Sequence, residues 1–350
     1  MNVVFWCWMH VWSYKQSRVT EKVFRKQKNM KDSLWNYHDP YEWLARVRKS
    51  SFPPLSICVA ITGGVQGKES NPNLPETPEE QVEQTYACYE AGASMVHIHV
   101  RDPQKWWDGS GNVDQYRKVN AMIREACPDI IINNTTGGSF GMTIDQRVAC
   151  LDAGPEVATL NMGPDMYKLK IRERKAPLAH PHPAEELSGI MPITYDELHQ
   201  FGIAMKDRDI KPEMEVYHPG QLWAVFDLVE QGLVEMPYFV QFVMGYGMSP
   251  WATPRNLVNF FENLPSQTFV EVSGVGPFQL PMTALAMIMG AQMVRVGMED
   301  NVYYGRGRLL ESNLEAVERA ARMARDLNRE IASPAQVREM LGLSQVPSQY

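Results

Sequence analysis

The chain has 350 residues, of which 44% are hydrophobic and 21% charged, and its formal net charge is -7. This composition is typical of a globular protein with one large barrel or two smaller domains, and the acidic balance without a basic stripe argues against a nucleic-acid partner. No apolar run reaches the ~20 residues needed to span a bilayer, so no membrane partner is expected. The five cysteines are widely spaced, which predicts free thiols in a reducing, cytoplasmic location.

Residues 1–50 are interpreted as an N-terminal extension. Residues 1–12 are apolar and aromatic, but they lack the basic start and the small-residue cleavage site of a signal peptide. Residues 15–31 are basic, and Met30 is a plausible alternative start. A membrane-contacting or partner-binding arm is the second interpretation.

From residue 55 onward, short β-branched or aliphatic runs alternate with helix-like segments. Strands are expected at residues 55–62, 94–100, 129–135, 157–162, 213–217, 238–244, 268–273 and 293–297. Helices are expected from the N-cap Thr77 onward and at residues 114–127, 143–152, 194–208, 220–231, 254–264, 281–289, 311–327 and 333–341. This alternation predicts an α/β fold, a (β/α)₈ TIM barrel. A glycine-rich dinucleotide motif is absent after the first strand, which argues against an open doubly wound sheet.

The catalytic barrel is expected at residues 51–332. Residues 163–192 are too long for an ordinary loop and are interpreted as an insertion, either a lid or a surface elaboration. Residues 333–350 are expected to form a C-terminal helix and tail.

Two histidines two residues apart are the most informative feature of the sequence. His97 and His99 lie in an apolar, β-prone run, and residues i and i+2 of a strand point to the same face. A divalent metal explains such a pair, because histidine is a frequent metal ligand. Two core histidines bonded to backbone groups are the alternative.

A carboxylate at the end of the eighth strand completes a possible ligand set. Arg295, Gly297 and Glu299 share parity, and in a closed barrel the eighth strand neighbours the first. Glu299 can then join His97 and His99. Two histidines and one carboxylate leave an open position, which favours catalytic Zn²⁺, with Fe²⁺ and Mn²⁺ as alternatives. An ion pair between Glu299 and Arg295 is compatible with this.

Other histidines are weaker candidates for the metal. His180 and His182 have the same spacing, but they lie in a proline-rich loop. His218 follows a strand and is a candidate fourth ligand, substrate contact or surface residue.

Polar residues at the ends of the other expected strands are suited to the formation of an enolate. Asp300 is the candidate base for a C–H proton, and Arg295 can hold that carboxylate or one of the substrate. The candidate substrate-binding residues, whose hydroxyl, amide and backbone groups can contact oxyanions, are Thr135, Gly137, Gly138, Thr159 and Asn161. Strand propensity alone also accounts for the two threonines.

Together these residues resemble the β-keto acid cleavage enzyme family. The matching pieces include residues 61–64, 73–80, 96–99, 135–138, 158–161, 212–217, 242–245 and 295–301. The resemblance implies a Zn²⁺-dependent barrel, commonly a homotetramer, which converts a β-keto acid and acetyl-CoA to acetoacetate and a new acyl-CoA. It implies that His97, His99 and Glu299 bind the metal and that Asp300 is a base oriented by Arg295.

Three positions depart from the family pattern. Thr135 stands where a relative has serine, and Val65 stands where the aminohexanoate enzyme has a glutamate that meets an ammonium group. An apolar or neutral substrate tail is therefore expected. Pro277 replaces an arginine, and if that arginine helps to hold CoA, then Lys168, Lys170 and Arg172 are candidate substitutes.

Two alternatives remain open from the sequence. An amidohydrolase-like hydrolase also uses two histidines at a strand end, but it needs histidines on later strands, and the expected sixth strand has none. A non-catalytic barrel that binds a metal or a small carboxylate is the other.

Overall fold

The computed structural model describes residues 33–138 and 141–350. The expectations for residues 1–32, including an alternative start at Met30, lie outside the described residues. Within the described part, Leu34–Tyr350 forms one compact unit.

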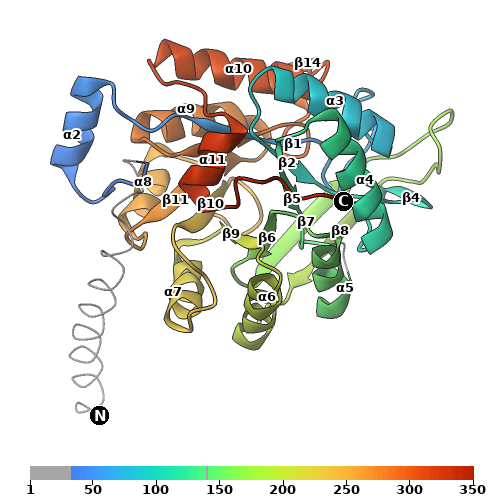
Figure 1. Ribbon diagram of the computed structural model, residues 1–350. Helices are drawn as coiled ribbons and strands as arrows, with labels where there is room; N and C mark the ends of the chain where they lie inside the picture. The colour runs from blue at the N-terminus through green and yellow to red at the C-terminus, as the bar shows by residue number, and fades with distance from the viewer. Residues whose placement is uncertain (1–32, 139–140) are drawn as a thin grey trace. The chain divides into compact units, whose positions relative to one another are not determined.

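Eight parallel strands close into a barrel, which confirms the expected (β/α)₈ fold (Figure 1). Each strand pairs with its neighbours along the chain, and the last pairs with the first. The strands are β1 (Ser56–Ala60), β2 (Met95–Ile98), β5 (Ile131–Asn134), β6 (Val157–Asn161), β9 (Lys211–Val216), β10 (Tyr238–Met244), β11 (Thr268–Gly274) and β12 (Met293–Val296).

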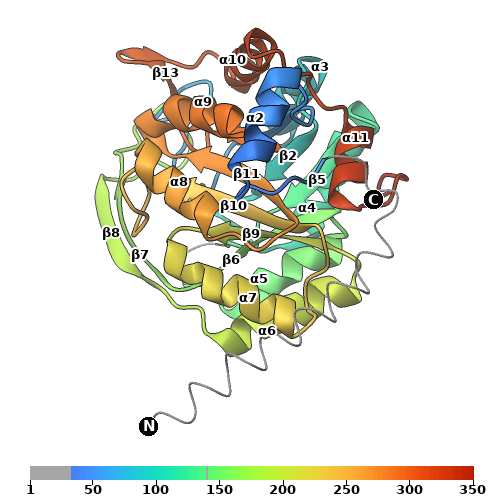
Figure 2. The ribbon, with the colours of Figure 1, turned by 90° about the vertical axis from the view of Figure 1, so that its left-hand side faces the viewer.

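Helices surround the barrel and lie close to the expected ranges (Figures 1 and 2). They are α3 (Pro78–Glu90), α4 (Val113–Ala126), α5 (Ile144–Val148), α6 (Tyr195–Asp207), α7 (Leu222–Glu230), α8 (Pro254–Glu262), α9 (Gln279–Met289) and α10 (Asn313–Asp326). Thr77 caps α3 as expected, since its side chain accepts a hydrogen bond from the Glu80 amide and Glu80 bonds back to the Thr77 amide.

Strand alternation sorts the core into two parts. Outward residues such as Val96 and Ile98 pack against the helices, whereas inward residues such as Cys58 and Met95 meet inside the barrel. Helix α11 (Pro334–Leu341) packs Val337 and Leu341 onto this inner cluster. Apolar side chains therefore fill the end of the barrel where the strands begin, and the polar residues gather where the strands end.

The chain before the barrel also packs on it. Trp35 is buried, and its indole nitrogen donates a hydrogen bond to the Gly290 carbonyl at 3.1 Å. Helix α2 (Pro40–Lys49), which the sequence pattern did not predict, begins after the N-cap Asp39.

The long segment after β6 is a β-hairpin of β7 (Asp165–Ile171) and β8 (Glu185–Met191), seen along one side of the barrel in Figure 2. Arg174 fixes the outer loop of this hairpin, the segment between Ile171 and Glu185 that joins β7 to β8. The guanidinium lies 2.8 and 2.9 Å from the two carboxylate oxygens of Glu76 and 2.7 Å from Glu69. Arg174 is buried, and buried charges need such partners.

Two smaller hairpins also lie outside the barrel sheet. They are β3 (Arg101–Asp102) with β4 (Lys105–Gly109) and β13 (Tyr303–Gly305) with β14 (Arg308–Leu309). None of the helices in the described part of the chain has both the length and the apolar composition of a membrane span. Cys58, Cys88, Cys127 and Cys150 are buried and unpaired, as expected for free thiols.

Candidate metal centre and active site

The two histidines point into the barrel because their neighbours pack outward. Val96 and Ile98 occupy the helix-facing side of β2, so His97 projects to the interior. His99 directly follows the strand and keeps the same direction, with its ring 5.1 Å from that of His97. The expected side-by-side arrangement is present.

Glu299 reaches the histidines because the chain bends across the end of β1. Strand β12 ends at Val296, and Gly297 has a φ of +134°. A Cβ at Gly297 would lie 2.3 Å from the Ala60 carbonyl oxygen, so only glycine fits this crossing. The Glu299 amide then donates to the same oxygen at 3.1 Å. Glu299 is therefore placed by this bend, and not by strand parity alone.

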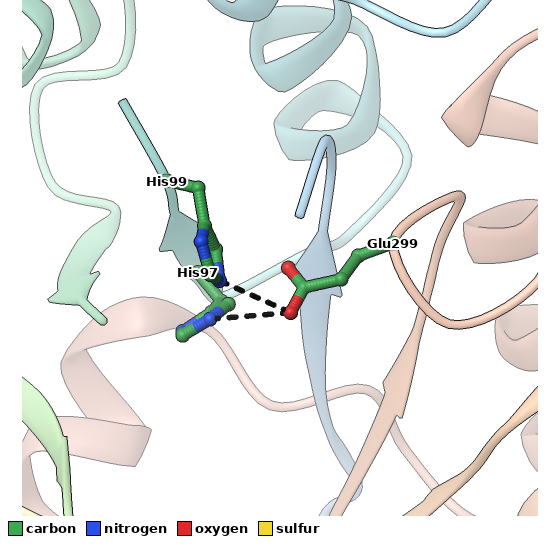
Figure 3. Close-up of side chains that lie close together, drawn as sticks. All are labelled: His97, His99 and Glu299. Carbon is green, nitrogen blue, oxygen red and sulfur yellow. Dashed lines mark ion pairs between the residues drawn. The ribbon is translucent and has the colours of Figure 1, made fainter. Parts of the chain in front are cut away.

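The three side chains converge on one point, as Figure 3 shows. Glu299 Oε1 lies 3.6 Å from His97 Nε2 and 3.2 Å from His99 Nε2. One ligand atom from each of the three lies within 4.8 Å of the others. No other such group of three occurs among the residues that the structure describes.

Three further observations fit a cation at this cluster. Glu299 Oε2 is buried and has no hydrogen-bond partner within the described chain. Burial holds the pKa of His97 well below its usual value, which keeps the ring neutral as metal binding requires. Gly63 leaves room beside the cluster, since a Cβ there would lie 2.6 Å from Glu299 Cγ. The residues present therefore fit a two-histidine, one-carboxylate metal site.

Arg295 connects the cluster to the candidate base. Its Nη2 lies 2.7 Å from Glu299 Oε1 and 3.1 Å from Asp300 Oδ1, and its Nε lies 3.0 Å from Asp300 Oδ2. Ser273 Oγ also contacts Asp300, at 3.3 Å. Burial raises the pKa of Asp300 even though Arg295 acts to lower it. Asp300 is thus a buried carboxyl group held in a fixed orientation.

The expected substrate-binding residues surround the next two strand ends. Thr135 Oγ1 accepts from the Gly137 amide at 3.0 Å, and Thr159 Oγ1 accepts from the Thr136 amide at 3.0 Å. Gly138 has a φ of +65°. The two threonines therefore shape the glycine turn after β5, and their proposed substrate contacts stay a prediction.

Asn161 belongs to a buried network that sequence reasoning did not assign. It donates to Glu215 Oε2 at 2.5 Å and to Tyr217 Oη at 3.1 Å, and it accepts from Arg147 at 3.0 Å. Glu215 Oε1 lies 3.5 Å from Arg295 Nη1. Glu213 and Glu215 lie two residues apart on β9, so both face the barrel interior, and nothing in the sequence indicates their partners.

A second pair of carboxyl groups lies deeper in the barrel. Gln241 Nε2 donates to Glu213 at 2.5 Å and to Glu271 at 2.8 Å. Burial raises the pKa of both acids, and each is fully buried. One proton shared by the pair avoids two buried negative charges.

The weaker histidine candidates lie elsewhere. His218 is exposed, and its Nδ1 accepts from the Gly220 amide at 3.0 Å. His180 and His182 are in the loop beyond β7, where the His182 backbone pairs with Arg174. None of them joins the group around Glu299.

The fold and this cluster define a (β/α)₈-barrel enzyme with a candidate metal site at the carboxyl ends of its strands. The chain belongs to the beta-keto acid cleavage enzyme family, whose model matches residues 54–343. This membership confirms the expectation of an acyl-transferring enzyme and argues against an amidohydrolase-like one or a non-catalytic barrel.

Two relatives support the family assignment, and one solved structure supports the fold. The 3-keto-5-aminohexanoate cleavage enzyme of Fusobacterium nucleatum is 39% identical over 291 residues, covering 83% of this chain and 98% of the relative. The 3-dehydrocarnitine:acetyl-CoA trimethylamine transferase of Rhizobium meliloti is 30% identical, covering 82% of this chain and 96% of the relative. A solved complex of ObcA with oxaloacetate has a TM-score of 0.63 at 20% identity, covering 78% of this chain and 68% of ObcA, which supports the fold alone.

Proposed function

We propose that the protein is a Zn²⁺-dependent β-keto acid cleavage enzyme that uses acetyl-CoA. The observation that carries the proposal is the contact of Arg295 with both Glu299, in the histidine cluster, and Asp300. In this arrangement the buried Asp300 carboxyl group, the proposed base, would lie beside the bound metal. The relatives from Fusobacterium nucleatum and Rhizobium meliloti are named for keto acid cleavage and for transfer to acetyl-CoA, respectively.

His97, His99 and Glu299 would hold the metal. Two histidines and one carboxylate with an open position are typical of catalytic Zn²⁺. A bound metal ion polarises a substrate carbonyl and so stabilises the negative charge of an enolate. The loop at Gly63 and Gly64 packs against Glu299 and His99, and this packing would limit the movement of the ligands.

Asp300 would remove the proton from C2 of the β-keto acid. Arg295 would keep the Asp300 carboxylate in place, and its Nη1, which has no hydrogen bond among the described residues, can donate to the substrate carboxylate. The hydroxyl groups of Thr135 and Thr159, the Gly137 and Gly138 turn and Asn161 would line the substrate side of the site.

The proposed reaction needs no reactant besides the β-keto acid and acetyl-CoA. The C2 carbanion attacks the acetyl carbonyl, a C–C bond forms, and CoA leaves as the thiolate. The thiolate then adds to the original ketone, the C2–C3 bond breaks, and the C2 carbanion regains the proton from Asp300. Acetoacetate and a new acyl-CoA result.

The substrate tail and the assembly are finer parts of the proposal. Val65 follows the Gly63–Gly64 turn, which lies against the metal cluster, and its apolar side chain favours a neutral tail over an ammonium group. We also infer a catalytic domain at residues 51–332, which contains the insertion at residues 163–192 and is followed by a C-terminal helix and tail at residues 333–350. A homotetramer and a cytoplasmic location follow from the family resemblance and the composition, and light scattering tests the tetramer.

A substrate panel tests the function. Purified protein loaded with Zn²⁺ is incubated with β-keto acids that carry neutral, acidic or amino-bearing tails, with and without acetyl-CoA. We expect acetoacetate only in the presence of acetyl-CoA, fastest with a neutral tail. Acetoacetate formation with no need for acetyl-CoA, or none with any acid, would overturn the proposal.

A further inference from the structure

A large cavity adjoins the candidate base. Its volume is about 680 Å³, within the range of small-molecule and cofactor sites. Asp300 and Asn301 line it, and so do Gly276 and Pro277 from the loop after β11. A molecule in this cavity would therefore have one part beside the reacting groups.

Three arginines from separate segments line the same cavity. Arg172 follows β7, Arg306 lies in the turn between β13 and β14, and Arg319 is on α10. The β13–β14 hairpin projects outward beside α10 (Figure 2). Among the described residues that line the cavity, Asp300 is the only acidic one. The cavity thus combines one catalytic carboxyl group with three positive charges.

None of these arginines is neutralised by a carboxylate within the described residues. Arg172 donates to the Tyr303 hydroxyl at 3.2 Å, and Arg319 lies 3.4 Å over the Tyr304 ring and donates to the Tyr304 carbonyl at 2.7 Å. Arg306 has neither a hydrogen bond nor an ion pair with any described residue. Arg308, by contrast, is paired with Glu315 and does not line the cavity. Guanidinium groups without an acidic partner are suited to phosphate.

We propose that this cavity binds CoA, with Arg172, Arg306 and Arg319 contacting its phosphate groups and the thioester lying beside Asp300. The assignment rests on the proposed function, because that reaction requires a thioester at the base. A CoA thioester carries its reactive carbon at one end and its phosphate groups at the other. The cavity offers a matching base and cluster of cations.

Two other basic residues of the β7–β8 hairpin, Lys168 and Lys170, take no part in this site. Lys168 lies 2.9 Å from Glu186 on the paired strand, and neither Lys168 nor Lys170 lines the cavity. Of the three substitutes suggested by the sequence, the cavity therefore selects Arg172, and it adds Arg306 and Arg319, which the sequence did not indicate.

Binding of CoA by calorimetry tests the proposal without turnover. Arg306→Gln is the main variant, because Arg306 is exposed and no described residue depends on it; Arg319→Gln is the second. The matched control is Arg325→Gln, which changes an exposed arginine of α10 outside the cavity. We expect CoA to bind about tenfold more weakly to each cavity variant, as for one lost charge-assisted hydrogen bond, and normally to the control.

Truncated probes identify the part of CoA that is bound. Adenosine 3′,5′-bisphosphate should compete with CoA for the parent protein and about tenfold less well for Arg306→Gln. In turnover, KM for acetyl-CoA should rise with kcat unchanged, whereas KM for S-acetylpantetheine should not change. Normal CoA binding by both variants, or equal losses with S-acetylpantetheine, would overturn the proposal. Arginine-dependent CoA binding without acetoacetate formation would instead sink the proposed function alone.

Discussion

Arg295 binds Asp300 through two contacts, Nε to Oδ2 at 3.0 Å and Nη2 to Oδ1 at 3.1 Å. The same Nη2 lies 2.7 Å from Glu299. Burial acts to lower the pKa of Arg295, but Asp300, Glu299 and Glu215 outweigh it and raise that pKa well above its usual value. One permanently charged guanidinium therefore positions both the candidate base and a candidate metal ligand.

Asp300→Asn should abolish most turnover while metal content stays normal. The amide keeps the size of the side chain but cannot take a proton, and general-base catalysis contributes roughly 10²–10⁴-fold. Acetoacetate formation and bound zinc are measured on the same sample, with the exposed Asp326→Asn as control. Turnover within a few fold of the parent would refute the role of Asp300.

Glu299→Gln should lower metal affinity on the order of 100-fold or more, because even residues behind the ligands contribute 10–100-fold. Equilibrium dialysis against Zn²⁺ followed by elemental analysis measures this. A chelator should likewise remove the activity of the parent, and added Zn²⁺ should restore it. Full occupancy in the variant would show that the carboxylate does not bind the metal.

Gly297→Ala should destabilise the fold by more than about 2 kcal/mol and also reduce metal binding. The added methyl group would meet the Ala60 carbonyl oxygen, and the φ of +134° is strained for alanine. Urea denaturation measures the loss. Gly305→Ala is the control, since a Cβ there has nothing within 4 Å. Equal stability of the two variants would contradict the proposed need for glycine.

Arg174→Gln should cost about 3–5 kcal/mol, because the buried carboxylates of Glu69 and Glu76 lose their partner. The outer loop of the β7–β8 hairpin should become sensitive to limited proteolysis. The exposed neighbour Lys175→Gln serves as control and should behave like the parent. An undiminished free energy of unfolding would mean that the pair does not hold the loop.

The stability of the metal-free protein should fall as pH rises from about 4.5 to 8. Burial raises the pKa of Glu215 to about 8, so the folded state keeps a proton that the unfolded state releases above its ordinary pKa of 4.5. The slope for one proton is at most ~1.4 kcal/mol per pH unit. Glu215→Gln should show a shallower fall in urea denaturation between these limits, and the exposed Glu262→Gln should not. A steeper fall in Glu215→Gln would contradict this sign.

The barrel could be predicted because parallel strands buried on both faces appear as short apolar runs between helices. The ends of the strands were less certain, because β-branched residues continue past the last hydrogen bond between neighbouring strands. The first strand, for example, was expected to reach residue 62, but β1 ends at Ala60. Thr77 was predicted as a helix cap, because capping is a local interaction. The N-terminal α2 and the three hairpins outside the barrel were not apparent.

The group of His97, His99 and Glu299 that forms the candidate metal site could be predicted in part. Strand alternation correctly indicated that His97 and His99 face one side. The path of Glu299 depends on the backbone of Gly297 and its approach to Ala60, which no local pattern reveals. Partners of buried charges, such as Glu76 for Arg174 and Asn161 for Glu215, are distant in sequence, so only the folded chain identifies them.

The crossing of the chain over β1 also has a consequence for biosynthesis. His97 and His99 lie on and just after β2, the second barrel strand. Glu299 follows β12, the eighth barrel strand, and reaches the histidines only after β12 has been synthesised and has paired with β1. A nascent or truncated polypeptide that ends before this point has two imidazoles and no carboxylate beside them. Acquisition of the ion should therefore be among the last steps of maturation and report that the ring of strands is complete.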